Sequence, residues 1–274
     1  MNKFAFDIII VAGQSNAEGN GIKNNENQMI LNDVYHLVDK NNIATKVCDD
    51  GKVILDMVYP TEMILEIAHE RAQDGKLLAD FPQTFAQKYI EDGKLGNGRK
   101  ILIVKTAVGG TGFSRKEWGV GSILLKRLVD MVDYSLSLNE DNKIIALLWH
   151  QGEHDCVENA GLSLDELYKF YSDNLTNQFI DLRNRYGKEI PIIAGEFVDS
   201  WADLPENKEK CDIIEKATRD VCDNIKNSMV VSSVGLLSND QNFHNGDNIH
   251  FCGESIYELG KRYYSAYKSM LDKK

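Results

Sequence analysis

The stretch from Asp7 to Gly19 constrains the fold of this chain more than any other. It holds four consecutive aliphatic residues, 8–11, followed by Ala-Gly, a pattern typical of a strand buried on both faces in the middle of a parallel sheet. Gly13 then permits a sharp turn, and Ser15 follows just beyond the carboxyl end of the strand. Ligands of open α/β sheets bind at that edge, so Ser15 is a candidate nucleophile.

The same serine has a simpler interpretation as the cap of the next helix. The local sequence, GQSN at 13–16, does not decide between a cap and a nucleophile. The decision depends on companion motifs at the ends of other strands.

Size and charge limit the kind of partner. With 274 residues, 43% hydrophobic and 27% charged, the chain can bury the core of one large α/β domain. A net charge of −11 argues against nucleic acid or an anionic membrane as a partner. We expect a small-molecule or oligosaccharide substrate, and the sequence leaves the oligomeric state open.

The amino terminus does not read as an export signal, because Lys3 is followed by a short apolar run that Asp7 interrupts. No other apolar stretch approaches the ~20 residues that span a bilayer. The five cysteines are scattered without C-x-x-C spacing: Cys48, Cys156, Cys211, Cys222 and Cys252. This pattern favours reduced thiols in a cytoplasm over a disulfide framework or a zinc site.

Strands and helices alternate along the rest of the chain. Further strands are predicted at 100–105, 143–148, 190–195 and 229–234, and helices at about 81–90, 122–138, 163–185, 206–225 and 253–270. Residues 20–76, rich in Asn and Asp, are expected to form a loop-rich insertion over the ligand end of the sheet. No linker or repeat interrupts the pattern, so it predicts a single domain over 1–274, a three-layer α/β/α sandwich with a five-stranded parallel sheet.

Polar or glycine-rich segments follow four of these strands. They are Ser15, the loop with Gly109 and Gly110, the segment with Gln151 and Glu153, and the loop with Asp247 and His250. The carboxyl ends of parallel strands share one edge of a sheet, so these residues are expected to lie together. Together they supply a nucleophile, a base, an acid and donors for an oxyanion, which is what acyl transfer requires.

In these blocks the sequence resembles the SGNH-type hydrolases, in the branch of the sialate O-acetylesterase-like proteins and carbohydrate esterase family six. The blocks are GQSN at 13–16, GGT at 109–111, WHQGE at 149–153 and D-x-x-H-F at 247–251. The resemblance implies a flavodoxin-like sandwich with strand order 2-1-3-4-5. It also implies a metal-independent serine esterase, without a cofactor, that removes acetyl groups from a sugar such as acetylated sialic acid or acetylated xylan.

The mechanism predicted from these parts begins with Ser15 attacking the acetyl carbonyl while His250 removes its proton. Both Asp247 and Glu153 are candidates for the acid that orients His250. The Asp-x-x-His spacing favours Asp247, because one loop turn can bring its carboxylate beneath the imidazole. The oxyanion donors are expected to be the Ser15 N–H, an N–H of Gly109 or Gly110, and the Gln151 amide.

The roles of several of these residues can be interpreted in a second way. Gln14 and Asn16 flank the nucleophile and are candidates for binding substrate, while Trp118 offers a face for a sugar or belongs to the core. Gln151 could instead bind loop backbone. The segment 150–155 holds four metal-ligating side chains but lacks the H-E-x-x-H pattern, so we expect no metal. The alternatives to this function are a carbohydrate-binding protein without catalysis and an esterase for other short acyl esters.

Overall fold

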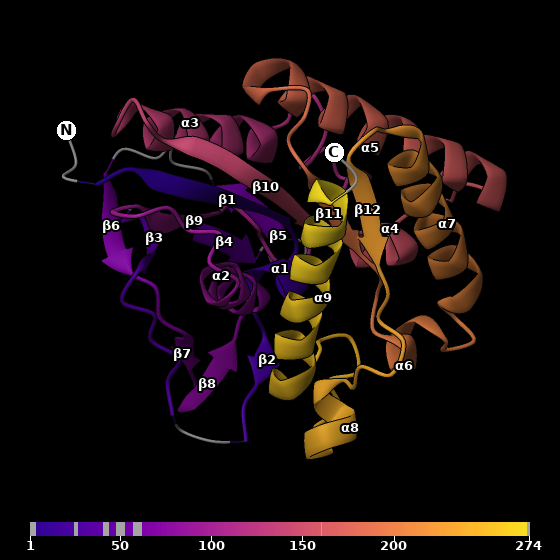
Figure 1. Cartoon of the computed structure of the whole chain (residues 1–274). Coiled ribbons are helices and arrows are strands. Elements are labelled where there is room, and N and C mark those ends of the chain that lie inside the picture. The colour runs from indigo at the N-terminus through magenta and orange to yellow at the C-terminus, as the bar shows by residue number, and fades with distance from the viewer. Residues whose placement is uncertain are drawn as a thin grey trace.

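The protein is described from a computed structural model, which covers residues 4–24, 27–40, 44–47, 53–56, 62–159 and 161–272. At its centre is a seven-stranded sheet in the order β12-β11-β10-β1-β9-β3-β6 (Figure 1). Its strands are β1 (Phe6–Gly13), β3 (Val34–Asp39), β6 (Met63–Ile67), β9 (Lys100–Lys105), β10 (Lys143–His150), β11 (Ile192–Gly195) and β12 (Ser228–Val231). Six of them run parallel, and only β6 is antiparallel to its neighbour.

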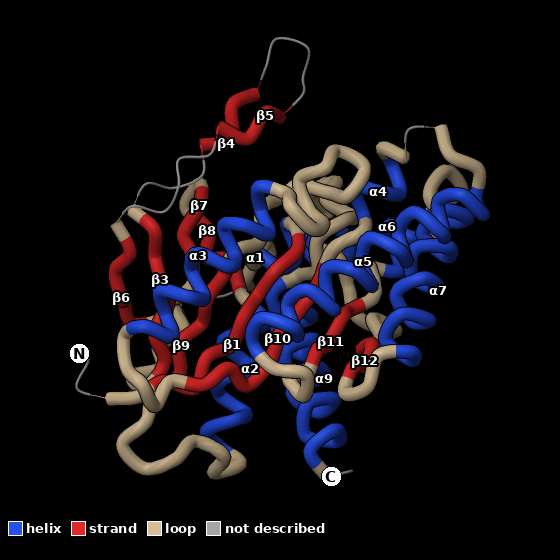
Figure 2. Tube along the Cα trace, turned by 90° about the horizontal axis from the view of Figure 1, so that it is seen from above, coloured by secondary structure: helices blue, strands red, loops and turns tan. Residues whose placement is uncertain are grey.

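Two layers of helices cover the sheet, as Figure 2 shows from above. One face packs against α3 (Ile123–Ser137), α5 (Leu164–Tyr186) and α7 (Lys208–Asn224), and the other against α2 (Phe81–Glu91) and α9 (Gly253–Leu271). Alternate residues of β1 serve the two layers, since Ile8 and Ile10 join the first core cluster and Ile9 and Val11 the second. This two-sided burial explains why the strand reads as an unbroken aliphatic run.

The central sheet has more strands than the five expected from the sequence. The five strands expected from the sequence form the run β9-β1-β10-β11-β12, and the segment 20–76 adds β3 and β6 beyond β9. That segment also forms a small sheet from β2 (Gly21–Ile22), β7 (Arg71–Gln73) and β8 (Lys76–Ala79). A separate antiparallel pair is formed by β4 (Ala44–Val47) and β5 (Val53–Asp56).

In the described part of the chain, four short helices occupy the loops between these elements. They are α1 (Ser15–Glu18), α4 (Glu153–Val157), α6 (Asp199–Ala202) and α8 (Asn239–Phe243). Three of them, α1, α4 and α6, begin within five residues after the carboxyl end of a parallel strand, and α8 lies in the loop that follows β12. Within the described ranges, no helix is long and apolar enough to cross a membrane.

Candidate active site

Ser15 begins α1 directly after β1, at a turn that only glycine permits. Gly13 has φ +133°, and a Cβ atom added there would lie 1.9 Å from the carbonyl oxygen of His150. The Gln14 N–H donates to that same carbonyl at 2.9 Å, which holds the turn against the end of β10. The helix-cap interpretation of Ser15 is not supported, because the N-cap position belongs to Gln14 and no side chain caps this helix.

The Ser15 side chain lies in a pocket of about 310 Å³. The lining residues come from α1 and the segment after it, from the β7–β8 hairpin, and from the loop before α9: Ser15, Asn20, Ile22, Gln73, Asp74, Lys76, Leu78, Asn239, Asp247 and His250. The pocket therefore brings together the candidate nucleophile and the candidate base, which are 235 residues apart in the sequence. It also shows that the segment 20–76 forms one wall of the site.

His250 is oriented by Asp247. The Nδ1 atom of His250 lies 3.0 Å from Oδ2 and 2.9 Å from Oδ1 of Asp247, and the His250 N–H donates to Oδ1 at 3.2 Å. Burial alone would raise the pKa of Asp247, but hydrogen bonds from His250 and Asn239 outweigh it and lower the pKa. Asp247 is thus held as a carboxylate beneath the imidazole.

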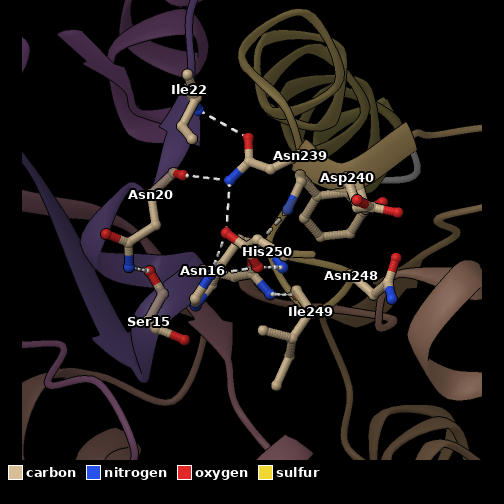
Figure 3. A network of polar contacts seen from close by, with 12 residues as sticks. Ser15, Asn16, Asn20, Ile22, Asn239, Asp240, Asn248, Ile249 and His250 are labelled. Carbon is tan, nitrogen blue, oxygen red and sulfur yellow. Dashed lines mark hydrogen bonds and ion pairs between the residues drawn. The ribbon is translucent and has the colours of Figure 1, made fainter. Parts of the chain in front are cut away.

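Asn239 is a site residue that the sequence reasoning missed. Its Nδ2 donates to Asp247 Oδ2 and to the Asn20 carbonyl, both at 2.9 Å, and its Oδ1 accepts from the Ile22 N–H at 2.9 Å (Figure 3). It therefore ties the segment that follows Ser15 to the acid of the His250 loop. The sequence signal that could have located it is the capping box formed by Ser238 and Gln241, which starts α8 at Asn239.

Asn16 holds the other side of the His250 loop. Its Nδ2 donates to the Ile249 carbonyl at 3.0 Å, and its Oδ1 accepts from the Phe251 N–H at 3.2 Å, so both neighbours of His250 are fixed (Figure 3). The same Nδ2 donates to Glu153 Oε1 at 2.9 Å. Asn16 is fully buried, so its amide serves the protein and does not face substrate.

Glu153 contacts Asn16, and no hydrogen bond joins it to His250 among the described contacts. It is buried, and its Oε1 lies 3.8 Å from Nε2 of His150. Burial raises the pKa of Glu153, against the lowering effect of the hydrogen bond from Asn16. Of the two candidate acids, the structure places Asp247 against the His250 ring.

Gly109 lies beside Ser15 although it follows a different strand. A Cβ atom added to Gly109 would lie 3.5 Å from the Ser15 Cβ and 2.9 Å from an oxygen of Glu18, so this loop passes directly beside the nucleophile. Gly110 has φ +66° with open space around it. The backbone of this loop at Gly109 therefore lies close to Ser15.

Gln151 does not have the free amide that an oxyanion donor needs. Its Nε2 donates to Asp155 Oδ2 at 2.8 Å and to the Thr111 carbonyl at 3.1 Å, with Gln14 Oε1 at 3.3 Å. Its Oε1 accepts from the Tyr171 hydroxyl at 3.2 Å. This pattern matches the alternative interpretation of Gln151 as a residue that binds the neighbouring loop.

Asp155, which accepts from Gln151, also binds the glycine-rich loop. It is a second site residue that the sequence analysis missed. Its two oxygens accept from the Phe113 N–H at 3.1 Å and the Ser114 N–H at 2.7 Å. Together with the bond from Gln151, these contacts fasten the segment after β10 to the glycine-rich loop after β9. The loop that carries Gly109 is thus held by a buried carboxylate.

Trp118 is a core residue, so the expectation that it offers a face to a sugar is wrong. It is 2% exposed, its Nε1 donates to Thr111 Oγ1 at 3.0 Å, and its ring packs edge to face on Trp149. Gln14 is buried as well, and its Oε1 accepts from the His154 N–H at 3.1 Å. Neither side chain faces the pocket.

The side chains in the segment 150–155 that could ligate a metal contact different partners. His150 Nδ1 lies 3.2 Å from the Tyr263 hydroxyl, and burial lowers the pKa of His150 to about 3. His154 Nε2 lies 3.4 Å from a Glu158 oxygen. Among the described residues, no group of three or more His, Cys, Asp or Glu side chains could hold a metal ion.

An α/β sandwich with a serine after its first strand and Asp-x-x-His before its last helix defines a hydrolase of the SGNH type. The family model for "Carbohydrate esterase, sialic acid-specific acetylesterase" matches residues 5–269, so the chain belongs to this family. It is therefore a carbohydrate O-acetylesterase. No curated protein sequence matches the chain significantly.

Solved structures resemble the chain over its whole length at low sequence identity. NanS is 17% identical, with a TM-score of 0.71 and coverage of 100% of both chains. A protein from Arabidopsis thaliana is 21% identical, with a TM-score of 0.64 and coverage of 97% of this chain and 98% of its own. A novel carbohydrate acetylesterase from Xanthomonas citri is 12% identical, with a TM-score of 0.60 and coverage of 98% and 57%. These likenesses show the same fold.

The contacts of Asn16 lead to a prediction. Asn16→Ala should lower the free energy of unfolding by at least about 2 kcal/mol, because it leaves the Phe251 N–H, the Ile249 carbonyl and the Glu153 carboxyl without their buried partner. It should also lower kcat by up to about 10²-fold, because His250 loses its support on both sides. Urea denaturation and initial rates measure the two effects.

The matched control is Asn174→Ala in α5, where the amide donates to the Phe170 carbonyl at 2.8 Å, within its own helix. It should cost less stability and leave kcat unchanged. Full activity in the Asn16 variant would show that the His250 loop does not depend on this contact.

Proposed function

We propose that Ser15, His250 and Asp247 are the catalytic triad of this esterase, and that its substrate is an O-acetylated sialic acid. The observation that carries the proposal is the shared pocket, in which Ser15 and His250 both line the wall while Asp247 bonds to His250 Nδ1 at 3.0 Å. With Nδ1–H directed to the carboxylate, the other ring nitrogen is unprotonated and can act as a base.

In the proposed reaction, His250 Nε2 takes the proton of the Ser15 hydroxyl as its oxygen attacks the acetyl carbonyl carbon. The tetrahedral intermediate collapses when the bond to the sugar oxygen breaks, and His250 returns the proton to that oxygen. The acetyl group is then carried by Ser15. Water, deprotonated by His250, then attacks the acyl carbon, the bond to the Ser15 oxygen breaks to release acetate, and His250 returns the proton to Ser15.

The negative charge of the intermediate needs hydrogen-bond donors that are in place before the reaction. We assign this role to the backbone N–H groups of Ser15 and of the Gly109–Gly110 loop. Support comes from the close approach of Gly109 to Ser15 and from the anchoring of this loop by Asp155. Gln151, whose amide is engaged by Asp155 and Thr111, would act by holding the loop.

Two observations favour a sialic acid over another acetylated sugar. The family model is described as sialic acid-specific. The pocket lining includes Lys76, an exposed cation that can meet the carboxylate of an acidic sugar. Polar side chains of the same hairpin, Gln73 and Asp74, complete a rim suited to hydroxyl groups.

The test compares acetate release from O-acetylated N-acetylneuraminic acid, from acetylated xylo-oligosaccharides, and from p-nitrophenyl esters of increasing acyl length. We expect the acetylated sialic acid to have the highest kcat/KM, and acetyl to be preferred over longer acyl groups. A higher kcat/KM for the acetylated xylo-oligosaccharides would overturn the assignment of substrate. Hydrolysis of p-nitrophenyl acetate tests the triad alone, because this ester contains no sugar. The comparison of the acetylated sugars tests the substrate assignment separately.

A further inference from the structure

Leu78 of β8 separates the Ser15 pocket from a larger cavity of about 700 Å³. Among the described residues, it is the only one that lines both spaces. Its side chain is 7% exposed, so it is packed between them. Leu78 is therefore part of a wall, and the mechanism proposed for Ser15 and His250 assigns it no role.

This wall belongs to the small sheet formed by β2, β8 and β7. Leu78 lies directly opposite Ile22 of β2 and directly opposite Arg71 of β7 in the two antiparallel pairings. Directly opposite residues of neighbouring strands point to the same face of a sheet, so these three side chains form one row. Ile22 lines the Ser15 pocket and Arg71 lines the larger cavity. The row thus leads from the pocket to the cavity, with Leu78 between them.

Ile22 and Leu78 supply the apolar part of the Ser15 pocket. Every other described residue that lines the pocket is polar or charged. The acetyl carbonyl carbon must reach the Ser15 hydroxyl, so the acetyl methyl group, one bond away, lies inside this pocket. Apolar groups are most stable against apolar surface. The methyl group is therefore expected to contact Ile22 and Leu78, while the sugar faces the polar rim.

The wall is tied to the segment that carries the nucleophile. Arg71 donates from Nη2 to Asn20 Oδ1 and, at 3.3 Å, to the Gly19 carbonyl. Asn20 in turn donates to the Ser15 carbonyl at 2.7 Å (Figure 3). The β7–β8 hairpin is thus fastened to the chain beside Ser15, which limits how far Leu78 can retreat from the nucleophile.

We propose that Leu78 sets the length of the acyl group, because a chain longer than acetyl meets its side chain, and that shortening Leu78 opens the pocket into the larger cavity. That cavity can receive an alkyl chain, since part of its lining is apolar: Leu37, Val38, Val108 and Met131. The inference rests on the proposed function for Ser15 as the nucleophile, and it does not depend on which sugar carries the ester.

The experiment compares kcat/KM for p-nitrophenyl acetate, butyrate and hexanoate in the unmodified enzyme and in Leu78→Ala. In the unmodified enzyme, kcat/KM should fall at least about tenfold from acetate to hexanoate, because the pocket excludes the longer chain. In Leu78→Ala, the ratio of hexanoate to acetate should rise at least about tenfold, because each methylene that enters apolar space favours binding by about fourfold.

The matched control is Leu77→Ala. Leu77 is the next residue of β8, points to the opposite face and lines neither space. It should leave the order of the three esters unchanged. Leu78→Val removes a single carbon and guards against a folding defect in Leu78→Ala; it should raise the ratio of butyrate to acetate at least about threefold. An unchanged order of esters in the folded Leu78 variants would overturn the inference.

A covalent probe locates the acyl chain directly. In a crystal structure of Leu78→Ala treated with an n-hexyl fluorophosphonate, the alkyl chain on Ser15 should extend past position 78 into the larger cavity. An alkyl chain that follows the polar rim instead would overturn the inference and leave the triad intact. Adding Ser15→Ala to Leu78→Ala should abolish hydrolysis of all three esters. Hydrolysis that persists in this double variant would contradict the triad, and the inference with it.

Discussion

Replacing Ser15 with alanine should lower kcat for acetyl-ester hydrolysis by at least about 10³-fold, the usual cost of removing a triad nucleophile. The fold should survive, because the Ser15 hydroxyl makes no hydrogen bond in the described part of the chain. The backbone N–H proposed for the oxyanion is retained in the variant. The measured loss therefore reports the hydroxyl itself, with initial rates on p-nitrophenyl acetate and circular dichroism as the two readouts.

Covalent labelling gives an independent check on the same residue. A fluorophosphonate should add its mass to the peptide that contains Ser15, and Ser15→Ala should abolish the label. The matched control is Ser172→Ala in α5, whose hydroxyl donates to the Lys169 carbonyl at 3.2 Å and which should keep full activity. Labelling of another peptide, or a Ser15 variant that hydrolyses esters normally, would move the nucleophile elsewhere.

The central strands could be predicted because both of their faces are buried, so that their consecutive residues are apolar. Every residue of β1 is buried, and β9 holds four consecutive buried positions, so both read as aliphatic runs. β3 was not assigned to the central sheet because only three of its six positions are buried, and β6 has no fully buried position. β3 pairs with β9, 67 residues further along the chain (Val34 with Ile101), β6 pairs with β3, and no local pattern encodes either pairing.

The motif residues could be located, but the directions of their side chains could not. Asp247 and His250 are three residues apart, so their contact follows from one loop turn. Asn16 and Glu153 meet across 137 positions in the sequence, and only the packing of α1 against the segment after β10 brings them together. The same packing turns Asn16 away from substrate, whereas position alone suggested a substrate contact.

The second large expected effect concerns the acid that orients His250, for which Asp247 and Glu153 are the two candidates. Asp247→Asn should lower kcat by up to about 10⁴-fold, as in serine proteases, because an amide beneath His250 Nδ1 favours the wrong tautomer of the ring. Glu153→Gln should cost less than about tenfold, because Gln keeps the oxygen that accepts from Asn16 and burial already favours the neutral form of Glu153.

The ionisation of Asp247 gives the physical reason for this loss. The pKa of Asp247 is lowered, so this carboxylate stays ionised through the neutral range, and Asp247→Asn removes the negative charge beneath the His250 ring. Circular dichroism and urea denaturation should show both variants folded. If Glu153→Gln instead proved the more damaging, His250 would depend on the buried chain through Asn16 and Glu153, and its direct contact with Asp247 would be structural.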